Sequence, residues 1–328
     1  MGFDVKERPM SSPLPQLVNT FGQDLKRRYG HRVHKLAIHA GFTCPNRDGS
    51  KGRGGCTFCN NVSFGPNARK DPEIADQIES GRKVIAKRTG AKHFFAYFQT
   101  YTNTYASVDE LDKLYRTALD EPGVIGLSVG TRPDCVQPEV LDLLCGYRDE
   151  GFEVWLELGL QSSFDETLDR VNRGHGFSEY KATAKAARAR GLPLCTHLII
   201  GMPGEERHHS LTTLDRVLNE GTDGLKLHPL HVVKGTQLAN EWRRGEYEPL
   251  ELQEYLETAA DIVENTPPEI VFHRLTGTAS PSILLAPDWC AKKWIVIDGI
   301  ANELVRRGTS QGSALESGNI AVKCQAAP

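Results

Sequence analysis

The chain has 328 residues and a net charge of −3 at pH 7; 39% of its residues are hydrophobic and 25% are charged. This balance is typical of a globular protein with a sizeable core, and it argues against a surface coated with positive charge for non-specific nucleic-acid binding. No apolar run is long enough to span a bilayer and the N-terminus lacks the apolar core of a signal peptide, so we expect no membrane segment and a cytoplasmic location.

Predicted strands and helices alternate along most of the chain. Residues 1–15 are expected to be a mobile arm, followed by a short helix or basic segment at 21–32. Apolar runs predict six strands, at 36–42, 93–99, 124–129, 153–160, 194–200 and 224–229. Helical patterns lie between and after them, at 71–88, 107–119, 138–150, 164–171, 177–190 and 209–219. This alternation indicates βαβ units and a parallel sheet whose strands all end on one rim.

The pattern changes after residue 235. A long helix is expected at 249–264, a strand at 269–275, and a helix or strand-to-helix segment at 294–307, with a frayed end from residue 308. We therefore expect four parts, an N-terminal arm, a core, an extension packed on the core and a tail, at 1–30, 31–240, 241–310 and 311–328. Six βα units are too few for an eight-stranded barrel, so the α/β core is predicted to be an open, partial TIM-like barrel.

The most informative stretch follows the first strand. Cys44, Cys56 and Cys59 have the spacing C-x11-C-x2-C in a polar, glycine-rich loop, and the next cysteine along the chain is Cys135. The last two cysteines can reach one metal centre from a single turn, and the glycines let the backbone fold closely around an inorganic core. Three thiolates on a four-iron cluster leave one iron free for an outside ligand.

Two other interpretations of these cysteines remain open. A structural zinc site could combine them with His31, His34 or His39. Alternatively, the three thiols could be unrelated residues of the core, because free cysteine is often simply buried.

With Phe58 between its last two cysteines, the stretch resembles the cluster loop of radical S-adenosylmethionine (SAM) enzymes. The long first gap resembles the branch that contains the Elongator catalytic subunit and the YhcC/YtqA-like proteins, as do residues 101–105, 226–236 and 286–293. The resemblance implies a (βα)6 barrel with a C-terminal α/β extension. It also implies a [4Fe-4S] cluster on the three cysteines, with SAM at the open iron. The reduced cluster would split SAM to give a 5′-deoxyadenosyl radical, with electrons from a flavodoxin- or ferredoxin-type donor.

The resemblance places SAM at the carboxyl ends of the strands. The loop after the second strand would hold the methionine amino group, although the Gly-Gly-Glu type motif of the family is absent there; an ordinary polar loop is the alternative. Gln161 beside Ser162, after the fourth strand, suits hydrogen bonds to the ribose of SAM. The forked guanidinium of Arg173 suits the SAM carboxylate. The Gly-x-Pro-Gly turn that begins at Gly201 resembles the family's motif on the adenine side. The expected SAM contacts are Gln99, Thr102, Asn103, Gln161, Ser162, Arg173 and Gly201.

The resemblance also suggests a substrate. The YtqA-like relatives are implicated in processing a carboxymethylaminomethyl side chain at C5 of the tRNA wobble uridine, which implies tRNA as a partner. Arg47, Lys51 and Arg53 in the cysteine loop and the basic residues of 82–92 are candidates for phosphate contacts. The alternatives are a radical SAM enzyme acting on a small metabolite or a porphyrinogen-like substrate, and a zinc-stabilised binding module.

Overall fold

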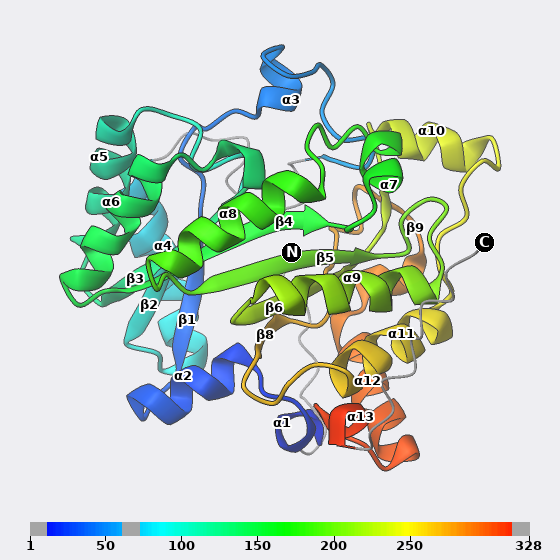
Figure 1. Ribbon diagram of the computed structural model, residues 1–328. Coiled ribbons are helices and arrows are strands. Elements are labelled where there is room, and N and C mark those ends of the chain that lie inside the picture. Colours follow the sequence, from blue (N-terminus) through cyan, green and yellow to red (C-terminus); the bar gives the residue numbers. More distant parts are fainter. Residues whose placement is uncertain (1–11, 61–72, 317–328) are drawn as a thin grey trace.

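The computed structural model describes residues 12–60 and 73–316. Seven strands form its central sheet: β1 (Val33–Ile38), β2 (His93–Phe98), β3 (Val124–Thr131), β4 (Glu153–Gln161), β5 (Leu194–Ile200), β6 (Gly224–Pro229) and β8 (Val271–Arg274). All neighbours are parallel and the order is β1-β2-β3-β4-β5-β6-β8. Because each strand pairs with the one before it, every crossover turns the same way and the sheet curls into a half-barrel (Figure 1). The predicted partial TIM-like barrel is confirmed.

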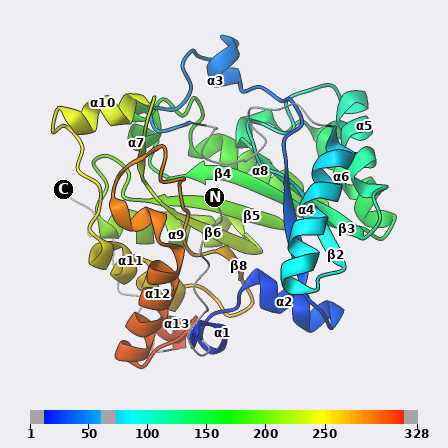
Figure 2. The ribbon, with the colours of Figure 1, turned by 180° about the vertical axis from the view of Figure 1, so that it is seen from behind.

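Helices cover the outer face of this curled sheet. The longer ones are α4 (Ile74–Thr89), α5 (Val108–Leu119), α6 (Pro138–Asp149), α8 (Phe177–Ala189), α9 (Arg207–Glu220), α11 (Leu252–Glu264) and α12 (Lys293–Arg307). In Figure 1, α8 and α9 lie in front of β4, β5 and β6. Figure 2, from behind, places α4 beside β1 on one side and α11 and α12 on the other. In the described part of the chain, no helix has the length and apolar character that crossing a membrane requires.

Short elements complete the fold. They are the helices α1 (Leu14–Leu17), α2 (Phe21–Tyr29), α3 (Pro45–Asp48), α7 (Asp165–Arg170), α10 (Gln237–Arg243) and α13 (Ser313–Glu316), the 3-10 turns at Pro133–Cys135 and Asp288–Ala291, and the antiparallel pair β7 (Val232–Val233) and β9 (Leu284–Ala286). Of these, α2 and α7 fall within segments predicted as helical, at 21–32 and 164–171, and the others lie outside the predicted helices and strands.

The inside of the half-barrel is closed at its lower end. Phe21, Phe95, Trp155, Cys195 and Val271 pack together as an apolar plug near the amino ends of the strands. A larger core fills the space between the sheet and the outer helices. The remaining hollow therefore opens toward the carboxyl rim, where the cysteine loop lies.

The first strand begins and ends earlier than predicted: β1 is 33–38, whereas 36–42 was expected. Its last residue pairs with Phe98, the end of β2. Beyond it, the backbone N–H of His39 donates to Gln77 Oε1 (2.9 Å), and Gln77 Nε2 donates to the His39 carbonyl (2.7 Å). Gln77 of α4 thus takes the place of a neighbouring strand as the hydrogen-bond partner of the His39 backbone. The chain can therefore leave the sheet after β1 and turn toward the cysteines.

Both ends of the chain are better packed than expected. Leu14 belongs to the core, so the prediction of a mobile arm is wrong for residues 12–15; residues 1–11 lie outside the described part. At the other end, Gln311 Nε2 donates to the carbonyls of Pro267 (2.7 Å) and Ile270 (2.8 Å). The predicted fraying is therefore wrong for residues 308–316, and residues 317–328 lie outside the described part.

The strand expected in the C-terminal extension joins the main sheet. As β8 it pairs with β6, and its outer edge is covered by the residues before α2: the Phe272 N–H donates to the Asn19 carbonyl (2.8 Å). The N-terminal and C-terminal parts of the chain thus meet at one edge of the half-barrel. The division into 1–30, 31–240, 241–310 and 311–328 stays a prediction.

Candidate active site

The cysteine loop lies above the carboxyl ends of the strands, with α3 at the top of Figure 1. Cys44, Cys56 and Cys59 all line one cavity, which continues down into the half-barrel. The sequence predicted that the loop and the strand ends would meet on one rim, and the structure brings them together.

The loop is fastened to the segment that follows α7. Buried Asn46 donates through Nδ2 to the carbonyls of Asn172 (2.6 Å) and Arg173 (2.9 Å), and Asn172 Nδ2 donates back to the Gly55 carbonyl (2.8 Å). Gly174 has φ +71°, and a Cβ there would lie 2.3 Å from Asn46 Oδ1. Only glycine can occupy position 174 at this distance from Asn46, so the cysteine loop and the segment after α7 pack against each other in close contact.

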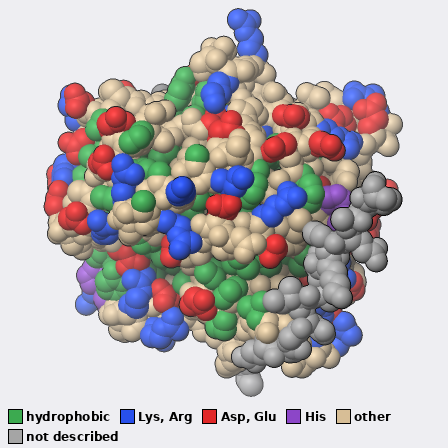
Figure 3. Space-filling model, in the orientation of Figure 1, with side chains coloured by type: hydrophobic (Ala, Val, Ile, Leu, Met, Phe, Trp, Pro, Cys, Tyr) green, Lys and Arg blue, Asp and Glu red, His purple; other side chains and the backbone are tan. Residues whose placement is uncertain are grey.

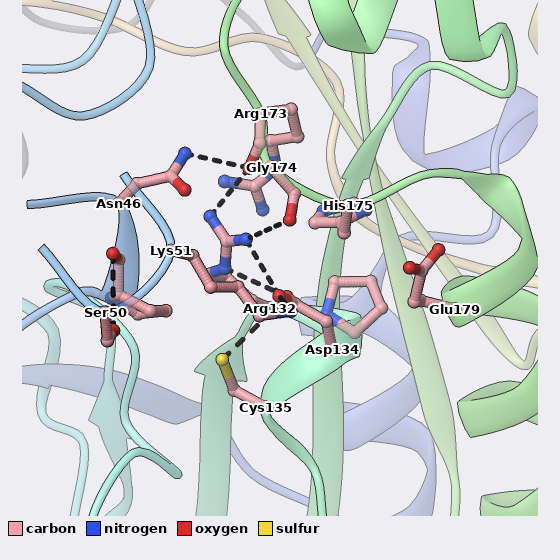
Figure 4. Close-up of polar contacts among 12 residues, drawn as sticks. Asn46, Ser50, Lys51, Arg132, Asp134, Cys135, Arg173, Gly174, His175 and Glu179 are labelled. Carbon is pink, nitrogen blue, oxygen red and sulfur yellow. Dashed lines mark hydrogen bonds and ion pairs between the residues drawn. The ribbon is translucent and has the colours of Figure 1, made fainter. Parts of the chain in front are cut away.

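A buried ion pair ties the end of β3 to the same two segments (Figure 4). Arg132 donates to the carbonyls of Arg173 (2.7 Å) and Gly174 (3.1 Å) and to both carboxylate oxygens of Asp134 (2.9 Å each). Lys51 reaches Asp134 from the cysteine loop (2.6 Å). Although burial opposes ionisation, Arg132 and Lys51 lower the pKa of Asp134 to about 2. Arg132 and Asp134 therefore pair with each other.

Hydrogen-bond donors surround the cysteine sulfurs. Arg173 Nη1 lies 3.6 Å and Asn46 Nδ2 3.9 Å from the Cys56 Sγ. Burial and the neighbouring Cys56 raise the pKa of Cys59 to about 11, and Arg47, which donates to the Cys59 carbonyl (2.7 Å), opposes this rise. Asn46, Arg173 and Arg47 thus place donors near the sulfurs of Cys56 and Cys59, although burial outweighs them in setting the pKa of Cys59.

The spacing of the thiols bears on which metal centre they could hold. Four ligands around zinc place their sulfurs about 3.8 Å apart, given Zn–S bonds of about 2.3 Å. Of the described residues, only Glu157, Cys195 and His197 form a group of three whose ligand atoms lie within 4.8 Å of one another. The three loop sulfurs are not all within 4.8 Å of one another, a spacing compatible with the larger body of a four-iron cluster. His31, a proposed fourth zinc ligand, precedes β1 at the opposite end of the sheet and contacts His93.

Four of the predicted SAM contacts, Gln99, Thr102, Gln161 and Arg173, line the cavity. The Thr102 hydroxyl and the Arg173 Nε are buried and have no hydrogen-bond partner within the described residues. Gln161 has φ +82°, which is rare outside glycine, and such strained backbone tends to concentrate at functional sites. These groups have the capacity to bind a polar ligand.

The other three, Asn103, Ser162 and Gly201, are not among the residues that line the cavity. The Asn103 amide donates to the carbonyls of Phe98 (3.1 Å) and Gly130 (2.6 Å), so it holds two strand ends together. The Ser162 hydroxyl donates to Glu205 instead. The Gly201 carbonyl accepts from the Tyr247 hydroxyl (2.9 Å). Their role as SAM contacts stays a prediction.

Sequence reasoning missed most of the cavity's lower end. We name the polar layer there the charged floor; it consists of Lys35, Tyr97, Ser128, Glu157, His197 and Lys226. Glu157 is fully buried at its centre. It accepts hydrogen bonds from Lys226 Nζ (2.9 Å) and His197 Nε2 (2.6 Å), and also from Lys35 and Ser128.

Opposite charges set the ionisation of this floor. Although burial opposes it, Lys226 and Lys35 hold the pKa of Glu157 well below its ordinary value. Burial lowers the pKa of Lys226 to about 8, with Glu157 resisting the change, and burial lowers that of His197 to about 4. At neutral pH the floor thus holds an ionised Glu157 carboxylate, a protonated Lys226 and a neutral His197.

The basic candidates for nucleic-acid contact lie at two ends of the molecule. Helix α4 runs from the rim back to the start of β2 at His93, so its basic residues in 82–88 lie away from the cavity mouth. Arg53 is exposed on the cysteine loop, and Lys51 and Arg47 are partly engaged there by Asp134 and Cys59. Figure 3 shows basic side chains at the apex of the molecule, over α3. The loop is therefore the better candidate.

Known proteins resemble this chain over almost its whole length. The radical SAM superfamily model matches residues 44–217, and the radical SAM C-terminal domain model matches residues 222–306. Protein YhcC of Escherichia coli is 50% identical over 302 residues, 92% of this chain and 96% of that protein. YtqA of Bacillus subtilis is 35% identical and covers 90% of this chain and 91% of its own.

More distant relatives share part of the sequence or the fold alone. A tRNA uridine(34) acetyltransferase of Methanocaldococcus jannaschii is 30% identical over 156 residues, 46% of this chain and 28% of that protein. The structure of Elp3 from Methanocaldococcus infernus superposes with a TM-score of 0.65 and 16% identity over 87% of this chain and 68% of that one.

Proposed function

The chain belongs to the radical SAM superfamily, and on that premise we propose that it modifies the C5 side chain of the wobble uridine of tRNA. Its family makes it an iron–sulfur enzyme that uses a [4Fe-4S] cluster and SAM, as the cysteine loop predicted. When bound, these two cofactors supply a 5′-deoxyadenosyl radical that abstracts hydrogen from a substrate. The chain's own residues position the reactants and exclude water.

One observation carries the choice of substrate. The sequence shared with the tRNA uridine(34) acetyltransferase spans nearly half of this chain, and that protein is named for its action on uridine 34. The similarity supports a nucleoside of the same kind as the substrate of this chain.

The shape of the cavity is compatible with this proposal. It lies inside the half-barrel beneath the cysteine loop, so a nucleotide would have to leave its stack to reach it. Arg53 is exposed on that loop, close to the mouth, where the phosphates of a flanking strand would lie. A donor of the flavodoxin or ferredoxin type is expected to reduce the cluster and stays a prediction.

Within the cavity, we assign cofactor roles to residues by position. Cys44, Cys56 and Cys59 would hold three irons. Arg173 lies beside the Cys56 sulfur and presents an unpartnered Nε, which suits the SAM carboxylate at the open iron. Gln161 would bind the ribose.

SAM binding tests these assignments. Arg173→Ala and Gln161→Ala are expected to raise the SAM dissociation constant, Arg173→Ala by roughly tenfold or more, because a hydrogen bond to a charged group contributes about 1.5–3 kcal/mol. Anaerobic equilibrium dialysis measures the affinity, and iron content shows that the cluster remains. Arg170→Ala, at an exposed arginine of α7, is the matched control. Full SAM affinity in both variants would show that the two assignments are wrong.

The tRNA proposal is tested on nucleosides. In cells lacking the protein, mass spectrometry of total tRNA should show accumulated carboxymethylaminomethyluridine, the expected substrate. Wild-type protein should restore the profile, and the Cys56→Ala variant should not. An unchanged profile in a strain without a redundant enzyme would contradict the proposal and favour a small metabolite or a porphyrinogen-like substrate.

A further inference from the structure

The positive charge on the β6–β8 side of the cavity has no negatively charged partner among the residues that line the cavity. Arg274, at the end of β8, and Lys226, its neighbour in register on β6, both line the cavity. None of the described residues that line it carries a carboxylate. The nearest one, Glu157, lies beneath and is already bonded to Lys35, Lys226 and His197.

Arg274 in particular is left uncompensated. Arg274 is half-buried, and among the residues that the structure describes its side chain forms neither a hydrogen bond nor an ion pair. The other cavity arginines are engaged: Arg132 by Asp134, Arg47 by the Cys59 carbonyl and Arg173 by the Gly159 carbonyl. A cation removed from water without a partner is costly, so a free guanidinium at this depth indicates a ligand of opposite charge.

A second, independent feature lies beside it. His231 lines the cavity, is 5% exposed, and has a buried Nδ1 with no hydrogen-bond partner in the described part of the chain. Burial and the charge of Arg274 lower the pKa of His231 to about 4. It therefore stands as a neutral imidazole, which can donate one hydrogen bond without adding charge.

We propose that Arg274, Lys226 and His231 form an oxyanion-binding subsite on the β6–β8 side of the cavity, so that the substrate carries a carboxylate or a phosphate. The arginine fork matches either group with two parallel hydrogen bonds, and Lys226 adds a point charge. The inference rests on the proposed function in that it places the substrate in this cavity. It restricts the substrate to one that carries an acidic group.

Thermal unfolding of the reconstituted holoprotein with saturating SAM tests the subsite, because an anion that binds the folded state raises Tm. Sodium acetate and sodium phosphate are the probes, each compared with chloride at constant ionic strength. We expect one of them to raise Tm by several degrees in the wild type. This increase in Tm should vanish in Arg274→Gln and persist in part in Arg274→Lys. It should remain in the control Arg243→Gln, which changes an exposed arginine of α10. The probe that raises Tm more, acetate or phosphate, indicates whether the subsite prefers a carboxylate or a phosphate.

Two results would overturn the subsite. One is an equal gain in the wild type and Arg274→Gln, or no gain in either, since the anion effect would then not depend on this arginine. The other is a tenfold loss of SAM affinity in Arg274→Gln, which would show that Arg274 binds the carboxylate of SAM and not an anion of the substrate. Neither result depends on tRNA: an unchanged nucleoside profile with an intact anion gain would reject the proposed substrate and keep the subsite.

Discussion

Reconstituted Cys56→Ala protein is expected to hold no iron–sulfur cluster, and the same is expected of Cys44→Ala and Cys59→Ala. The wild type should bind about four irons per chain, since each thiolate holds one iron of the cluster and the fourth is left for SAM. Without one thiolate a second iron is open to solvent, so the cluster is lost during purification. Iron analysis and the visible spectrum measure the cluster, and 5′-deoxyadenosine formation should fall to background in each variant.

Other cysteines of the chain supply the controls. Cys145 is half-buried on α6 and its sulfur faces the Arg190 carbonyl (3.9 Å), far in the fold from the loop. Cys195 lies in the apolar plug, where alanine removes some packing and no metal ligand. Both alanine variants should keep the iron content of the wild type. A wild-type protein that bound one zinc and no iron would contradict the assignment.

The alternation of strands and helices was predictable because the central strands are buried on both faces and the outer helices have one apolar side. Helix α5 even begins after Ser107 as expected, with the Ser107 side chain accepting from the Glu110 N–H. The placement of β8 was not predictable. Whether a strand after residue 240 joins the sheet depends on its long-range pairing with β6 and on Asn19, which no local pattern encodes.

The candidate site, like the fold, has one part that the sequence predicts and one part that it does not. The cysteine loop was recognisable because its residues are adjacent in sequence. The charged floor was not, because Lys35, Glu157 and Lys226 come from three strands and meet only when the sheet curls. A signal was present nonetheless: Glu157 interrupts the apolar run of β4, and a charged residue in a strand buried on both faces needs a partner. Lys226 and His228, two residues apart on β6, both line the cavity.

The charged floor should make a large contribution to stability through Glu157. Glu157→Gln keeps the shape of the side chain but leaves Lys35 and Lys226 without their counter-charge inside the barrel. Removing one partner of a buried ion pair costs about 3–5 kcal/mol, and we expect a loss of that order at pH 7 in urea unfolding. The folded-state pKa of Glu157 is depressed, so its contribution is present above the ordinary value of 4.5 and is lost as pH falls below it. The difference between the variant and the wild type should therefore narrow in acid.

Two further variants separate charge from packing. Glu150→Gln, at an exposed glutamate paired with Arg116, should change the unfolding midpoint little. Adding Lys35→Met to Glu157→Gln should recover part of the lost stability, because it removes one of the uncompensated cations and leaves an apolar side chain of similar length. If Glu157→Gln unfolds like the wild type at pH 7, or if Lys35→Met adds a further loss instead of a recovery, Glu157 does not act by balancing the two lysines.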